Sequence, residues 1–305
     1  MSEPQPINPP APRHGHRRRL DELPAEPSVW PAVLFYAFAA GWLVATALLV
    51  AGFEPPARWR WTEGLLPLLA AFAVAGTLLR RLPLQNAVCI AAIALVFTGG
   101  IMACGVTSGV PFGLIRFTER ADPKLWDRLP VWIPLWWTAI VIASRETIRV
   151  VLQPYRKDRQ YGIWMVIFAA VLAMLMALSW EPFGVRVKSL WVWQTSERTV
   201  CWYGAPWVNF VGWLATAVVT LGFCSPWLIA KHPVKTGLSL YPALLWALIN
   251  LHFTIGNALR GIWLAAGVGV ALSATVVWLA WRGLKFAEAN PPGPRPAPQS
   301  PPGAS

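Results

Sequence analysis

The sequence predicts an all-α fold, a polytopic membrane helix bundle with about eight transmembrane helices (seven to nine). Its 305 residues are 56% hydrophobic and 13% charged, and the mean hydropathy is +0.47. Soluble domains are about 25% charged, so this composition favours a membrane protein. Apolar runs of about 20 residues recur along the chain, which is the length that a helix needs to cross a bilayer. The alternation expected of a membrane β-barrel is missing.

Eight segments have the length and hydropathy of membrane spans. They are residues 30–52, 64–80, 84–106, 131–152, 162–180, 206–230, 240–256 and 260–282. The first is too long for the apolar part of a signal peptide and is expected to remain as an anchor. We expect one helical domain over residues 29–286. Residues 1–28 (basic and proline-rich) and 287–305 (proline-rich) lack the apolar content of a packed core and are expected to be disordered tails.

The distribution of basic residues predicts an orientation. Clusters at residues 13–19, 80–81, 156–159, 231–235 and 282–285 fall on one side of the membrane if eight spans alternate. The positive-inside rule makes that side cytoplasmic, together with both termini, in a multi-pass protein of the plasma membrane. The formal net charge of +12 therefore reflects orientation, and we expect no nucleic-acid partner.

The sequence contains no pattern typical of a metal or nucleotide site. Its four cysteines show neither C-x-x-C spacing nor paired histidines and are expected to pack as small apolar residues: Cys89, Cys104, Cys201 and Cys224. Glycine-rich phosphate-binding loops are absent as well. We expect no cofactor and no metal.

Two long connections, at about residues 107–130 and 181–205, are expected on the same outer face, because odd-numbered connections share a side. The first carries four motifs in order: P-F-G at 111–113, F-T at 117–118, P-K-L at 123–125 and L-P-V-W-I-P-L-W at 129–136. The second begins with E-P at 181–182, followed by W-V-W at 191–193 and Y-G-A-P-W-V-N-F-V-G-W at 203–213.

In these motifs the chain resembles the membrane-integral carotenoid biosynthesis and hydratase family. That family includes the γ-carotene hydroxylating enzymes of bacteria and the bisanhydrobacterioruberin hydratases of archaea. The resemblance covers about residues 85–225, and the motif at 203–213 is its most specific part. Two positions depart from the family pattern. The acid–proline pair is usually Asp-Pro but is Glu-Pro here, and Asp122 replaces the glycine before P-K-L.

The resemblance implies a carotenoid hydratase, a lyase of the hydro-lyase type that adds water across the terminal isoprenoid double bond of a carotenoid ψ end group. Protonation of that bond gives a tertiary carbocation, which water captures, and neither step needs a metal or a redox cofactor. The implied partners are water and a carotenoid or related polyene dissolved in the lipid bilayer.

The proton donor has to be a carboxylic acid that stays protonated near neutral pH, which apolar surroundings favour. Glu181 directly follows an apolar run and is the first candidate, with an ordinary solvated interfacial glutamate as an equal alternative. Asp122 is the second candidate. For Asp122, a solvated pair with Lys124 or Arg128 is the stronger expectation.

Tyr203 and Asn209 are candidates for orienting the attacking water. An amide without a partner is costly in a membrane, so Asn209 must bond to something, and a bond between helices is the equal alternative. Aromatic faces stabilise a carbocation, although tryptophans also form the interfacial belt of ordinary membrane proteins. The candidate substrate-binding residues are Phe112, Trp136, Trp191, Trp193, Trp202, Trp207 and Asn257.

Asn250 and Asn257 share a helix face, for which a bond between helices is favoured over catalysis. Glu146 is expected to form a structural ion pair with Arg149 toward the cytoplasmic end. Two other functions remain open. One is a non-catalytic lipid-binding, pigment-binding or transport membrane protein, and the other is a different isoprenoid-modifying membrane enzyme.

Overall fold

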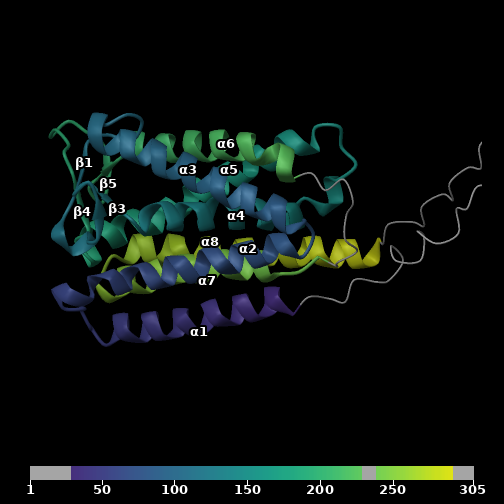
Figure 1. The fold of residues 1–305 in the computed structure, drawn as a ribbon, viewed down its shortest axis with the longest axis horizontal. Coiled ribbons are helices and arrows are strands. Elements are labelled where there is room, and N and C mark those ends of the chain that lie inside the picture. The colour runs from purple at the N-terminus through teal and green to yellow at the C-terminus, as the bar shows by residue number, and fades with distance from the viewer. Residues whose placement is uncertain (1–28, 229–237, 291–305) are drawn as a thin grey trace, which may run out of the picture.

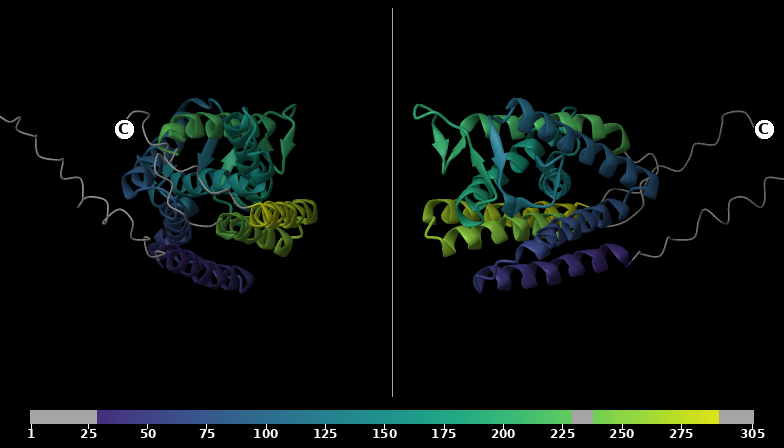
Figure 2. Two further views of the ribbon diagram at one scale, coloured as in Figure 1. Left: turned by 90° about the vertical axis from the view of Figure 1, so that its right-hand side faces the viewer. Right: turned by 60° about the vertical axis from the view of Figure 1, so that its left-hand side comes forward.

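A computed structural model of the protein describes residues 29–228 and 238–290. In this part of the chain, eight α-helices lie side by side in one bundle (Figures 1 and 2). They are α1 (Trp30–Val50), α2 (Leu65–Leu79), α3 (Leu84–Ser108), α4 (Ile133–Val151), α5 (Tyr161–Pro182), α6 (Trp207–Leu228), α7 (Tyr241–Leu259) and α8 (Trp263–Ala289). Each helix overlaps one predicted span, so the predicted all-α polytopic bundle is confirmed.

Seven of the described helical segments are long and apolar enough to cross a membrane, which makes this a multi-pass membrane protein. α4 is the exception, because its second half carries Arg145, Glu146 and Arg149. It is instead the central helix, with 14 of its 19 residues buried, and it packs against α2, α3, α5, α7 and α8. Its charged side chains are therefore surrounded by protein and not by lipid, where they would be costly.

The connections that carry the motifs meet at one end of the bundle, which we call the strand end (Figure 1). There β1 (Ile115–Phe117) pairs antiparallel with β4 (Trp191–Trp193), with Ile115 opposite Trp193. Two smaller hairpins lie there too, β2 (Lys124–Leu125) with β3 (Leu129–Pro130) and β5 (Cys201–Trp202) with β6 (Ala205–Pro206). The sequence did not predict these strands, because two or three residues are too few to show a period of two.

The first residues of α1 and the last residues of α8 lie at the opposite end of the bundle from the strands (Figure 1). This arrangement fits a chain that reverses direction at each connection. α8 continues to Ala289, three residues beyond the predicted end of the helical domain. Of the tails predicted at 1–28 and 287–305, residues 1–28 and 291–305 lie outside the described residues, as does the basic cluster at 231–235.

Small residues allow α7 and α8 to pack closely. Ala265, Gly269 and Ser273 recur every four residues on α8 and are all buried. Asn250 of α7 donates hydrogen bonds from Nδ2 to the Gly269 carbonyl at 2.8 Å and to the Ser273 hydroxyl at 2.9 Å. The expected helix-to-helix role of Asn250 is thereby confirmed, and close approach with interhelical hydrogen bonds is how helices associate in lipid.

Gly269→Ala is expected to destabilise the bundle by about 1–3 kcal/mol, since the added methyl group overpacks a tight contact. A Cβ at this position would overlap Thr254 Oγ1 and lie 2.8 Å from Ser179 Oγ. Gly267→Ala is the matched control, because no atom lies within 4 Å of its Cβ position. Thermal unfolding in detergent would compare the two variants, and equal midpoints would contradict the predicted contact.

Candidate active site

The site begins with Glu181 in the last turn of α5. Pro182 follows it and ends the α-helix, and the chain continues as a short π-helical turn, η4 (Phe183–Val187). Glu181 is 5% exposed, so the alternative of a solvated interfacial glutamate is wrong. A buried carboxyl group needs hydrogen-bond partners, and the strand end supplies them.

Two indole groups come from β4. Residues two apart on a strand point to the same side, so W-V-W directs both tryptophans inward and Val192 outward. Trp191 and Trp193 each donate from Nε1 to Glu181 Oε2, at 3.1 and 3.0 Å. Gly184 makes this possible, because a Cβ there would overlap the Trp191 ring.

The third donor is Asn209, in the first turn of α6. It is fully buried, and its Nδ2 lies 2.8 Å from Glu181 Oε1. This bond links α6 to α5 and ends on the candidate acid, so the interhelical alternative for Asn209 is confirmed. Its role in orienting water stays a prediction. Among the described residues no cation pairs with Glu181. The motifs at 191–193 and 203–213 therefore converge on the carboxyl group of the E-P motif through neutral N–H donors.

An aromatic cluster surrounds this carboxyl group. Trp213 stacks on Trp137 with ring centroids 3.4 Å apart, and Trp137 packs against Trp180 at 5.1 Å. Phe112, a predicted substrate-binding residue, is buried against Trp213 at 4.3 Å. Trp180 also contacts Trp191 edge to face at 6.1 Å. Trp180 therefore connects the hydrogen-bonded site to the rest of the cluster.

Three other predicted residues form a separate group around the β5–β6 turn. Trp202 donates from Nε1 to the Leu178 carbonyl at 2.9 Å, and Trp207 is 46% exposed. Tyr203 occupies the turn with φ of 51°, and the Arg186 guanidinium lies 5.5 Å from its ring centroid. None of the three is recorded in a hydrogen bond with Glu181 in the described part of the chain.

Asp122 and Asn257 also lie outside the carboxyl site. The Asp122 side chain is 45% exposed and pairs with Lys124 at 3.1 Å, as the solvated-loop expectation predicts. Asn257 is buried on α7 and donates from Nδ2 to the Ser179 carbonyl of α5 at 2.9 Å. Asn257 therefore links two helices, and this contact does not support the predicted binding of substrate.

An apolar cavity of about 330 Å³, which we call the side cavity, lies beside Glu181. Its walls come from α1, α2, the start of α4, α7 and the residues next to Glu181, with six aromatic side chains: Phe53, Trp132, Trp136, Trp180, Phe183 and Phe253. Of the predicted site residues, Trp136 alone lines it. Glu181 lies between Trp180 and Phe183 in the sequence, but its own side chain is not part of the wall.

The side cavity is also lined by polar residues that were not predicted as site residues. Glu63 and Lys188 form an ion pair, with Nζ 2.8 Å from Oε1. His252 also lines the cavity, and its Nδ1 lies 3.0 Å from Thr46 Oγ1. One indication of Glu63 and Lys188 was available in the sequence, namely their position relative to the predicted spans. Glu63 stands at the outer end of the second span and Lys188 follows the fifth, so both belong to the face that carries the motifs.

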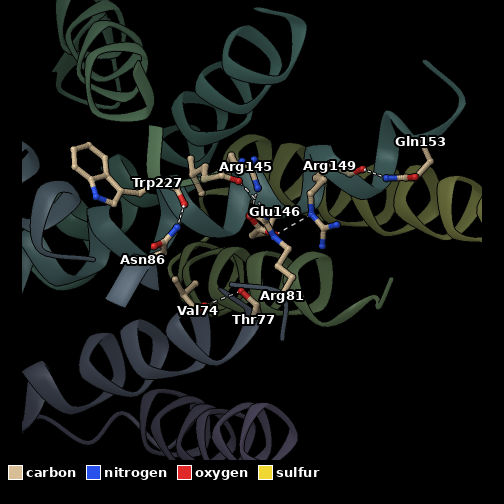
Figure 3. Close-up of polar contacts among 10 residues, drawn as sticks. Val74, Thr77, Arg81, Asn86, Arg145, Glu146, Arg149, Gln153 and Trp227 are labelled. Carbon is tan, nitrogen blue, oxygen red and sulfur yellow. Dashed lines mark hydrogen bonds and ion pairs between the residues drawn. The ribbon is translucent and has the colours of Figure 1, made fainter. Parts of the chain in front are cut away.

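Glu146 forms a separate cluster with three arginines (Figure 3). It is fully buried and pairs with Arg81 at 2.7 Å, with Arg149 at 3.0 Å and with Arg145. The predicted Arg149 pair is confirmed, with two further arginines. Glu146 stands 13 positions after the start of α4, which corresponds to about 20 Å along the helix. The group is therefore remote from the start of α4 at the strand end.

Comparison with known proteins agrees with this architecture. The family described as carotenoid biosynthesis protein matches residues 62–276, which is more than half of the chain. Bisanhydrobacterioruberin hydratase of Haloarcula japonica is 26% identical over 239 residues, covering 71% of this chain and 76% of that protein. No solved structure matches. The chain belongs to the carotenoid biosynthesis protein family.

Proposed function

We propose that the protein is a carotenoid hydratase that protonates the terminal double bond of a ψ end group and lets water capture the tertiary carbocation. The observation that carries the proposal is the environment of Glu181. This carboxyl group is buried, has no cationic partner among the described residues and accepts three N–H bonds. The similarity to a hydratase supports the reaction class.

The hydrogen bonds of Glu181 suit a group that gives up a proton. Burial among apolar side chains disfavours the charged form at rest. When the proton leaves, the indoles of Trp191 and Trp193 and the amide of Asn209 already point at the developing negative charge, which is how preorganised donors lower a barrier. In this proposal Oε1, which accepts one of these bonds where Oε2 accepts two, carries the acid proton beside Asn209.

The aromatic side chains would stabilise the carbocation. Indole and phenyl faces attract a cation, and the attraction is greatest where water is excluded. Trp136, Trp180 and Phe253 present such faces around the side cavity. Trp191 and Trp193 instead donate hydrogen bonds to Glu181. Tyr203 lies nearer the surface, where it would help to admit water.

The substrate would reach the site from the bilayer, since a long polyene is insoluble in water. Val44, Leu48 and Leu65 line the side cavity and are also exposed on the surface of α1 and α2, which gives it a rim toward lipid. Glu181 does not line the side cavity, so proton transfer to a substrate held there would require neighbouring side chains to move. In this proposal the strand end faces outward and the Glu146 end is cytoplasmic, in the plasma membrane.

Expression in bacteria that accumulate lycopene or γ-carotene tests the proposal. We expect the pigment to gain one water per reacting end group, as measured by mass spectrometry of extracted carotenoids. Cells with the empty vector are the control. Unchanged pigment that copurifies with the protein would contradict the hydratase and support the pigment-binding alternative.

A further inference from the structure

We propose that the side cavity holds the isoprenoid end group and that Glu63, paired with Lys188, is the base that accepts a proton from the attacking water. This inference rests on the proposed hydratase function and names the second catalytic group of the reaction. Glu181 supplies the proton for the double bond, and Glu63 receives one from water. Neither the sequence motifs nor the resemblance assigns a role to Glu63.

The Glu63–Lys188 ion pair lies between two pockets. Glu63 and Lys188 line the apolar side cavity and also a polar pocket of about 90 Å³, which includes Glu54, Arg60 and Arg120. The pair therefore stands where an apolar cavity meets a pocket lined mostly by charged side chains. Its side chains are partly shielded, with Lys188 15% exposed and Glu63 28%. Water that attacks a cation in the side cavity would reach it here.

The two carboxyl groups have different electrostatic surroundings. Glu63 lies 2.8 Å from an ammonium group and is the anionic member of an ion pair. Glu181 is bonded only to neutral donors in the described residues. Acid–base catalysis by two carboxyl groups depends on such different environments, because one group must hold a proton while the other is ready to take one. His252 is partnered with Thr46 and is not needed as the base.

The reaction balances with these two groups. The O–H bond of Glu181 and the π bond of the alkene break, and a C–H bond forms at the less substituted carbon. Water then forms a C–O bond to the tertiary cation while one of its O–H bonds breaks and its proton goes to Glu63. The alkene gains one water. The proton on Glu63 returns to Glu181 through solvent, which restores both groups.

Glu63→Gln tests the base in the pigment-producing strain. We expect the variant to retain bound, unconverted pigment after purification and to hydrate it at least about 100-fold more slowly, because base catalysis contributes 10²–10⁴. Glu63→Asp keeps the charge and should recover measurable activity. Glu288→Gln is the control, since it removes an exposed ion pair of the same 2.8 Å length. Wild-type rates in Glu63→Gln would overturn the role of Glu63.

A pair of variants on α1 tests the cavity. Ala45 lines the side cavity, whereas Ala47 on the same helix is exposed on the surface. Ala45→Trp should abolish both bound pigment and hydration, and Ala47→Trp should leave both unchanged. Equal behaviour of the two would overturn the cavity assignment. Failure of the wild type itself to hydrate pigment would instead refute the proposed function, and the base role with it.

Discussion

Glu181→Gln is expected to lower the rate of carotenoid hydration at least about 100-fold while the protein still folds, because the amide has no acidic proton to give. The site can accommodate glutamine. Its carbonyl oxygen would accept the bonds from Trp191 and Trp193, and its NH₂ group would donate to Asn209 Oδ1, which has no partner in the described residues. That second bond requires a rotation of the Asn209 amide, which turns Nδ2 away from residue 181.

Pigment mass analysis and thermal unfolding in detergent should be measured on the same preparations. Glu181→Ala is the informative comparison, since it leaves the three donors without an acceptor. An unpaired buried donor costs about 1–3 kcal/mol, so the alanine variant should be both inactive and less stable. Full hydration activity in Glu181→Gln would remove Glu181 as the proton donor and leave it as an organiser of the surrounding helices.

Glu146→Gln is expected to lower the free energy of unfolding by about 3–5 kcal/mol, the cost of breaking a buried ion pair from one side. Arg81, Arg145 and Arg149 converge on this fully buried carboxylate. Without its charge, the three guanidinium groups would repel one another inside the bundle. The loss should appear as lower yield in membranes and an earlier thermal transition in detergent.

A second substitution separates this electrostatic effect from a change in packing. Arg145→Met in the Glu146→Gln background removes one of the repelling charges and should recover part of the lost stability. Glu288→Gln, at an exposed pair on α8, should cost little, since surface ion pairs contribute about 0–1 kcal/mol. A Glu146→Gln protein as stable as Glu288→Gln would show that the arginines are neutralised in another way.

The positions of the helices could be predicted from the sequence because hydropathy is a local property. Each predicted span corresponds to a helix, and both ends of α1 and α2 fall within two residues of the prediction. The charges in α4 were visible in the sequence, but its place at the centre of the bundle was not. A span of mixed polarity is compatible with several neighbours, and only packing selects among them.

The candidate site was predicted in part. Glu181, Asn209, Trp191 and Trp193 were all named from motifs, and the structure joins them by hydrogen bonds. Asp122 was named on the same grounds but is solvated, because the loop that carries it lies on the surface. A motif identifies residues of a family, whereas burial is decided by the elements that cover them.

By itself the sequence determined that this is a multi-pass helical membrane protein and that its unusual polar residues gather on one face. Tertiary structure alone decided that Lys188 lies beside Glu63, 125 positions earlier in the chain, and that both open onto an apolar cavity. The physical reason is how far apart in the sequence the interacting residues lie. Helix formation in a membrane follows from neighbours along the chain, but a cavity and an ion pair depend on how separate helices pack.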